Sequence, residues 1–67
     1  MDICETVGVN IRRLRIKRGM SQESLALAVN IQRGYLSQLE RGTRNMTLLV
    51  LQEIAAALGV KPAELLK

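Results

Sequence analysis

The stretch QESLALAVNIQRGYLSQLER, residues 22–41, decides the fold. Its apolar residues recur at intervals of three and four, which is the spacing of amphipathic helices and not the alternation of a strand. Asn30 divides the stretch, and asparagine is one of the few residues besides glycine that adopt the left-handed conformation of a sharp turn. Ala26 is small enough for two steeply crossing helices to touch there. We therefore predict two short helices, ending near Val29 and beginning near Gln32, that meet at a tight corner.

The outer face of the second helix differs from an ordinary solvated face of Glu and Lys. It presents guanidinium, hydroxyl and amide groups around a bare glycine: Arg33, Gly34, Ser37, Gln38 and Arg41. Arginine can bond O6 and N7 of guanine, and glutamine N6 and N7 of adenine, each through two hydrogen bonds. Two helices with this arrangement form a helix-turn-helix motif, whose second helix enters the major groove of DNA. A helical scaffold with a merely polar surface is the alternative.

The first helix of the pair should bury Leu25, Ala28 and Val29. Five apolar side chains should seal the inside of the corner: Leu25, Val29, Ile31, Leu36 and Leu39. Three further helical segments surround the motif. The first spans about residues 4–18, ends at Gly19 and buries Val7, Ile11 and Leu14. Another is capped by Thr47, ends at Gly59 and carries an inward stripe: Leu48, Leu51, Ile54, Ala55 and Leu58. Pro62 begins a last turn or two. The fold class is all-α, a compact five-helix domain over residues 1–67.

The composition restricts the class of protein. The 67 residues suffice for one domain, and 48% of them are hydrophobic, too many for a disordered tail. The longest apolar runs are far shorter than the roughly 20 residues that span a bilayer. The chain has one cysteine, Cys4, and no histidine. It therefore offers no cysteine pair for a disulfide, no set of ligands for a metal ion, and no candidate for acid–base or nucleophilic catalysis. We expect a reduced, cytoplasmic protein that is not an enzyme, has no cofactor and has no membrane partner.

The positive charge is unevenly distributed. The formal net charge is +4, and five of the seven residues in RRLRIKR, residues 12–18, are cationic. Arg33, Arg41 and Arg44 form a second group, and clustered arginine favours an anionic partner such as phosphate. Solubilising charge is the alternative for the first group. Tyr35 is the only aromatic residue, and single-strand binders need several stacking platforms, so duplex DNA is the favoured partner.

Three segments carry a resemblance to a known family: SQESLA from residue 21, RGYLSQLERGTRN from residue 33 and LGV from residue 58. They resemble the Cro/C1-type (Xre) helix-turn-helix family of bacterial and phage regulators, over about Ile11–Leu66. The segment from residue 33 is also similar to the controller proteins of restriction–modification systems. The resemblance implies a lambda-repressor-like domain in the bacterial cytoplasm, associated with the nucleoid, that binds a palindromic operator as a homodimer.

The resemblance also implies roles for individual residues. The bases would be approached by Gln32, Arg33, Ser37 and Gln38. Phosphates would be bound by Gln22, Tyr35, Arg41, Thr43, Arg44 and Asn45. Tyr35 has an alternative as a core residue. Arg15 and Glu40 would form an ion pair between the first and third helices. Gln32 is a weak N-cap, and Gly34 replaces a position that often contacts a base.

A dimer is expected because a single short recognition helix covers too few base pairs to find one operator in a genome. The expected dimer surface is apolar: Leu49, Val50, Val60, Leu65 and Leu66, with Ile3 beside them. Burial in the core is the alternative for Leu65. An activator would in addition contact RNA polymerase. The rival hypothesis is a protein-interaction module, such as an antitoxin or an antagonist of another regulator, which Leu27, Leu49 and Val50 favour.

Overall fold

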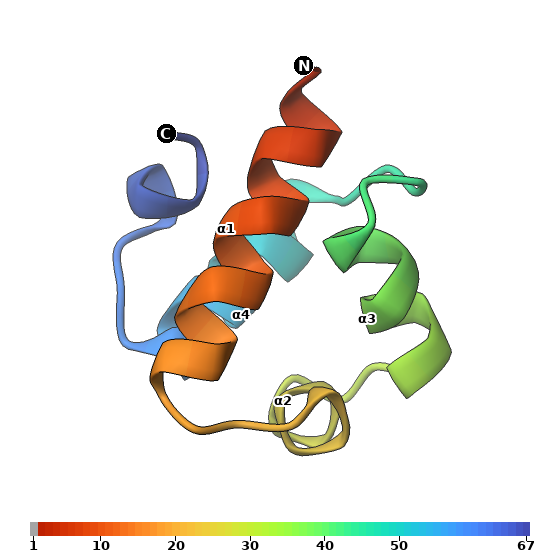
Figure 1. Ribbon diagram of the computed structural model, residues 1–67, viewed down its shortest axis with the longest axis vertical. Helices are drawn as coiled ribbons and strands as arrows, with labels where there is room; N and C mark the ends of the chain where they lie inside the picture. The colour runs from red at the N-terminus through yellow and green to blue at the C-terminus, as the bar shows by residue number, and fades with distance from the viewer. Residues whose placement is uncertain (1) are drawn as a thin grey trace.

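The computed structural model describes residues 2–67 and contains four α-helices and one 3-10 turn in that range (Figure 1). Their bounds are α1 Ile3–Lys17, α2 Gln22–Ala28, α3 Arg33–Glu40, α4 Leu48–Leu58 and η1 Pro62–Leu65. No strand occurs among the described residues. The all-α class is therefore confirmed, but a count of five α-helices is wrong. The last segment is a 3-10 turn whose bonds join residues three apart, as from Glu64 N–H to the Lys61 carbonyl at 2.9 Å.

The helix ends follow from local side chains. Asp2 and Glu5 form a reciprocal capping box at the start of α1. Thr47 Oγ1 accepts the Val50 N–H at 3.1 Å and starts α4, as predicted. Gln32 makes no side-chain capping bond at the start of α3, in agreement with its weakness as a cap. Gly59 ends α4 in the left-handed conformation, at φ 72°.

The corner between α2 and α3 has the predicted construction. Asn30 has φ 59° and is the one non-glycine residue with positive φ among those described. The Ile31 N–H donates to the Ala26 carbonyl at 2.9 Å, which ties the turn back onto α2. Ala26 is only 3% exposed, because α2 and α3 pack closely around it.

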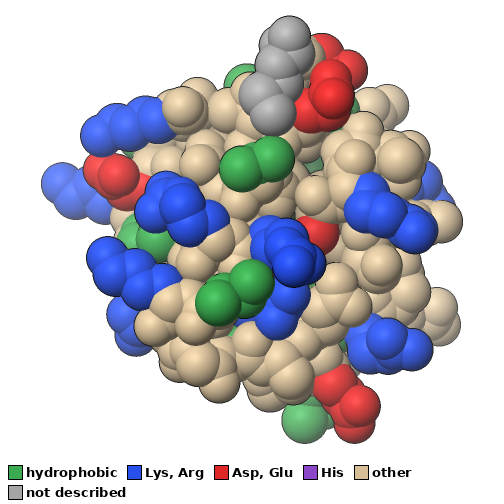
Figure 2. Space-filling view, in the orientation of Figure 1, with side chains coloured by type: hydrophobic (Ala, Val, Ile, Leu, Met, Phe, Trp, Pro, Cys, Tyr) green, Lys and Arg blue, Asp and Glu red, His purple; other side chains and the backbone are tan. Residues whose placement is uncertain are grey.

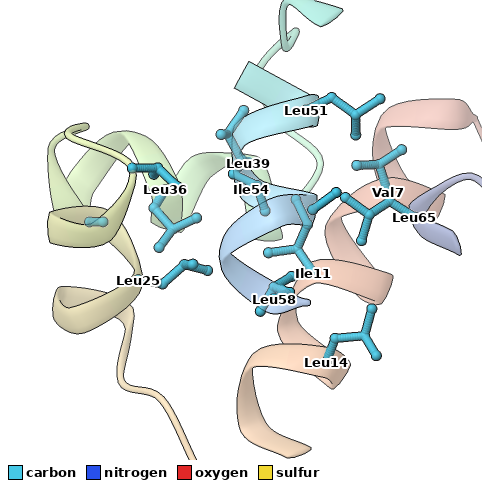
Figure 3. Close-up of a cluster of buried hydrophobic side chains, with 13 residues drawn as sticks. Val7, Ile11, Leu14, Leu25, Leu36, Leu39, Leu51, Ile54, Leu58 and Leu65 are labelled. Carbon is cyan, nitrogen blue, oxygen red and sulfur yellow. The ribbon is translucent and has the colours of Figure 1, made fainter. Parts of the chain in front are cut away.

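The core gathers side chains from all five elements (Figure 3). In Figure 1, α1 crosses in front of α4, with the α2–α3 corner on one side and η1 on the other. The predicted burial of two residues is wrong, because Leu48 is 82% exposed and Ala28 is also exposed. Both residues lie at helix ends. Periodicity predicts which side of a helix faces the core, but it does not predict whether a neighbouring element extends far enough to cover the last turn. Leu65 is fully buried, so of its two interpretations the core one holds.

Two residues of α1 that periodicity did not single out fix its position. A Cβ built on Gly8 would lie 2.5 Å from the Leu39 carbonyl oxygen, so only glycine allows α1 to approach α3 this closely. Asn10 is buried, and its Nδ2 donates to the Leu65 carbonyl at 2.9 Å. The first contact sets the distance from α1 to α3, and the second holds η1 against α1.

Candidate nucleic-acid interface

The outer edge of α3 is uncovered by the rest of the molecule. Arg33 and Gln32 are exposed, whereas Ser37 and Gln38 are half-buried. One open hollow beside α3 is lined by residues of α2 together with Arg33. A second hollow is lined by Gln38 and the turn residue Asn30. Arg33 borders one hollow and Gln32 and Gln38 border the other. We call the outer edge of α3 between the two hollows the ridge, and Ser37 lies on the same helix.

Gly34 lies on this ridge without a packing role. A Cβ built on it would meet nothing within 4 Å, so no neighbour requires a glycine there. The structure thus leaves the ridge one side chain short at this position, in the middle of the surface that faces outward.

The loop after α3 is tied to the ridge by Arg44. Its Nη1 donates to Gln38 Oε1 at 2.9 Å, and its guanidinium lies 5.1 Å from the centroid of the Tyr35 ring. Tyr35 is half-buried and packs against the core, as its core interpretation expects, and its contact with phosphate stays a prediction. Thr43 Oγ1 donates to the Gln38 carbonyl at 3.2 Å. A candidate phosphate-binding residue thus orients a candidate base reader, which the sequence did not indicate.

Arg15 and Glu40 form the ion pair that the resemblance implied. Arg15 Nε lies 2.7 Å from Glu40 Oε2, and the two side chains are only 10% and 3% exposed. Arg15 Nη1 also donates to the Met20 carbonyl at 2.8 Å. Gln22 joins this network because its Nε2 donates to Glu40 Oε1 at 3.0 Å. The network therefore connects α1, the start of α2 and α3, and it holds Gln22 at the edge of the hollow beside Arg33.

Asn45 is exposed in the same loop and contacts the start of α1. Cys4 Sγ donates to Asn45 Oδ1 at 3.6 Å. This contact joins residues 41 positions apart, and no local signal in the sequence indicates it. The amide nitrogen of Asn45 keeps its hydrogens for another acceptor.

The basic cluster of α1 divides into two groups. Arg15 is turned inward toward Glu40, and the guanidinium of Arg18 lies beside Gly59, where a Cβ would come within 2.9 Å of it. Arg12, Arg13, Lys17 and Arg18 are exposed. Figure 2 shows Lys and Arg side chains spread over the face that α1 forms, with few acidic groups among them. Of the five cations, Arg15 alone is thus held in a buried ion pair.

Residues 2–67 contain no group of three or more His, Cys, Asp or Glu side chains placed to hold a metal ion. Of the helices described, none has both the length and the apolar character needed to cross a membrane.

Comparison with known proteins agrees with this geometry. The family model described as helix-turn-helix matches residues 11–65. The chain is 46% identical over 65 residues to the uncharacterized HTH-type transcriptional regulator y4dJ of Sinorhizobium fredii, covering 97% of this chain and 84% of that protein. It is 47% identical over 60 residues to the control protein C.BamHI of Bacillus amyloliquefaciens, covering 88% and 74% of the two chains.

A solved structure with high similarity is that of the restriction–modification controller protein C.AhdI from Aeromonas hydrophila. It superposes with a TM-score of 0.89 at 39% identity, covering 92% of this chain and 94% of that one. The family match, the sequence relatives and the shared fold agree with the corner and ridge described above. The chain therefore belongs to the Cro/C1-type helix-turn-helix family, which includes transcriptional regulators and restriction–modification controller proteins.

Proposed function

We propose that this protein regulates transcription by binding duplex DNA at a palindromic operator as a homodimer, with α3 in the major groove. The observation that carries the proposal is the uncovered ridge of α3. Its polar side chains project from a corner that buried aliphatic residues and the Arg15–Glu40–Gln22 network hold rigid. A rigid corner favours specific binding because little conformational entropy is lost when the groove is entered.

Arg33 is the strongest candidate for reading a base. It is exposed at the first position of α3, where a guanidinium can reach O6 and N7 of guanine. Gln38 has its Oε1 bonded to Arg44, so its Nε2 is the group oriented to donate to a purine acceptor. Ser37, with its shorter side chain, and Gln32, at the N-cap before α3, complete the set of candidate base contacts.

The phosphate contacts are assigned to both sides of the ridge. On one side Gln22 would use the amide hydrogen that Glu40 does not take. On the other side Arg44 and Asn45 would grip the backbone from the loop, and the remaining candidates are Tyr35, Arg41 and Thr43. Contacts of this kind set the register of the protein on the duplex, whereas base contacts supply the specificity.

The dimer follows from the geometry of operators. Two recognition helices related by a two-fold axis read half-sites about 34 Å apart, one turn of the double helix. Of the residues expected at the dimer surface, Leu49 and Leu66 are 65% and 47% exposed. Val50 and Val60 are half-buried, and Leu65 supports the surface from the core.

The test is a fluorescence-anisotropy titration with duplexes selected from a random pool. If a dimer makes roughly 6–10 phosphate contacts, affinity should fall by about a thousandfold or more between 50 and 200 mM salt. Arg33→Ala should lose about 1–3 kcal/mol of discrimination at one base pair. Arg44→Ala should instead weaken binding to all sequences.

Arg12→Ala is the matched control, because it removes one exposed arginine of α1 that lies outside the ridge and the loop. Affinity for the selected duplex should change little in this variant. A loss equal to that of Arg44→Ala would show that binding reflects net charge and not the proposed interface. Binding that is insensitive to salt would contradict the proposal altogether.

A protein-interaction module is the second candidate, and the exposed Leu27 favours it. This side chain is 81% exposed on the outer side of α2, where it has no role in the fold. An antitoxin or an antagonist of another regulator would use such a surface for a protein partner. Sedimentation with and without the selected duplex separates the two candidates, because only the DNA-binding regulator shifts with duplex alone.

A further inference from the structure

The hollow between α3 and the loop that follows it carries a positive charge. Its walls include the turn residue Asn30, Gly34 and Gln38 of α3, and Arg44 of the loop. Arg44 is the one charged residue among the described residues on these walls, so they contribute a guanidinium and no carboxylate. A group that accepts hydrogen bonds is therefore favoured in this hollow over a group that donates them.

The side-chain amide of Gln38 is held in one orientation beside this hollow. Arg44 Nη1 contacts one end of the amide at 2.9 Å, and because arginine only donates, that end is the oxygen Oε1. The guanidinium itself lies 5.1 Å from the centroid of the Tyr35 ring. The N–H and Oγ1 of Thr43 both donate to the Gln38 carbonyl, at 3.1 and 3.2 Å, which ties the loop to the end of α3. The nitrogen Nε2 is therefore the end of the Gln38 amide that remains to bind a ligand.

Gly34 leaves the approach to this amide open. It precedes Gln38 by one helical turn, so the two residues lie on the same side of α3. A Cβ built on Gly34 would meet nothing within 4 Å. The space that a side chain would fill at this position is thus free for the edge of a base that approaches Gln38.

The major-groove edges of the two purines place different demands on this amide. Guanine presents two acceptors, N7 and O6, whereas adenine presents the acceptor N7 and the donor N6. Glutamine pairs with adenine by accepting from N6 through its oxygen while it donates to N7. In this chain the Gln38 oxygen already accepts from Arg44, and a second donor there would approach the guanidinium charge. The nitrogen that remains can only donate, which matches guanine.

We propose that Arg44, acting through Gln38, selects guanine over adenine at the base pair opposite Gln38. The inference rests on the proposed function and deepens it, because it names the base that is read and the residue that determines the choice. Arg44 can still bind phosphate, since a guanidinium has five N–H donors and the bond to Gln38 uses one of them. Arg44 is therefore a positioning residue for base reading as well as a phosphate contact.

The test is a fluorescence-anisotropy titration of the full chain with duplexes that differ from the selected sequence at one base pair. The base pair opposite Gln38 is identified as the one at which Gln38→Ala loses discrimination. The unmodified chain should bind the duplex with guanine at this position about tenfold more tightly than the duplex with adenine, the usual effect of one mismatched base contact.

Arg44→Ala should weaken binding to both duplexes and should also lower the ratio of guanine to adenine affinity about tenfold. The second effect is expected because the released amide can turn and pair with both groups of adenine. Arg41→Ala is the matched control, since it removes another exposed arginine assigned to phosphate and leaves the bond between Arg44 and Gln38 in place. It should weaken binding to both duplexes and leave the ratio unchanged. Circular dichroism verifies that all variants are folded.

The inference is overturned if the selected duplexes carry an A·T pair opposite Gln38, or if Gln38→Ala loses discrimination at none of the base pairs. It is also overturned if Arg44→Ala keeps the ratio of the unmodified chain, or if Arg41→Ala lowers the ratio equally. In each of these cases selective binding of the duplexes would leave the proposed function standing. A protein that binds no duplex would instead overturn the proposed function, and this inference with it.

Discussion

Replacing the partners of the buried Arg15–Glu40 pair separately and together tests how the corner is held. Glu40 receives three donors: Nε and Nη2 of Arg15 at 2.7 and 3.2 Å, and Nε2 of Gln22 at 3.0 Å. The Glu40 side chain is 3% exposed, so water cannot replace a lost donor. Arg15→Met leaves a buried carboxylate with Gln22 as its remaining described donor, and Glu40→Leu leaves a buried guanidinium.

The expected magnitude is large for a chain of this size. Removing one partner of a buried ion pair costs about 3–5 kcal/mol. A domain of 67 residues has a free energy of unfolding of about 3–10 kcal/mol in total. Each single variant should therefore lose about 30% or more of its free energy of unfolding, and its melting temperature should fall by more than about 10 °C. The double variant Arg15→Met/Glu40→Leu contains neither unpaired charge, so it should be more stable than either single variant.

The assay is urea unfolding followed by circular dichroism at a fixed protein concentration. Trimethylamine N-oxide is added to all variants where the single variants need a folded baseline. The double variant should still lose about 1–2 kcal/mol, because the Met20 carbonyl loses its Arg15 donor. A double variant whose loss equals the sum of the single losses within about 0.5 kcal/mol would refute the reasoning, because the two groups would then be energetically independent.

Three backbone positions yield further predictions. Gly8→Ala should lower the free energy of unfolding by about 1–3 kcal/mol or more, because its Cβ would overlap the Leu39 carbonyl at 2.5 Å. Gly34→Ala has open space around the added Cβ, so it should raise the free energy of unfolding by up to about 1 kcal/mol. Equal melting temperatures for Gly8→Ala and Gly34→Ala would show that α1 can shift away from α3 without loss of stability. Asn30→Ala should cost about 1–2 kcal/mol at φ 59°, whereas Asn30→Gly should be nearly neutral. A chemical-denaturation series that ranked alanine above glycine would contradict the strained turn.

Part of the candidate interface could be predicted from the sequence because its signals are local. Arg33 and Gln38 follow a turn that Asn30 marks, and helical spacing places them on the side opposite Leu36 and Leu39. The pairing of Arg15 with Glu40 joins residues 25 positions apart. It was expected only through the family resemblance, since no periodicity relates two separate helices.

The same distinction explains the errors. The spacing of the apolar residues in α4 assigns Leu48 to the inward face of the helix. Burial also requires another element to pack against that part of the helix, whereas the first turn of α4 borders an open pocket. Pro62 correctly marks the start of the last segment. Whether that segment is an α-helix or a 3-10 turn depends on its length and on its packing against α1, where Asn10 holds the Leu65 carbonyl.

By itself, the sequence determined the all-α class, the helix ends and the corner at Asn30, because caps, turns and amphipathic spacing act over a few neighbouring residues. The tertiary structure alone decided that α1 contacts α3 at Gly8, that Gln22 joins the buried ion pair and that Arg44 orients Gln38. These contacts link residues from different elements. Their energy depends on where packing brings those elements together, and no local pattern along the chain encodes that distance.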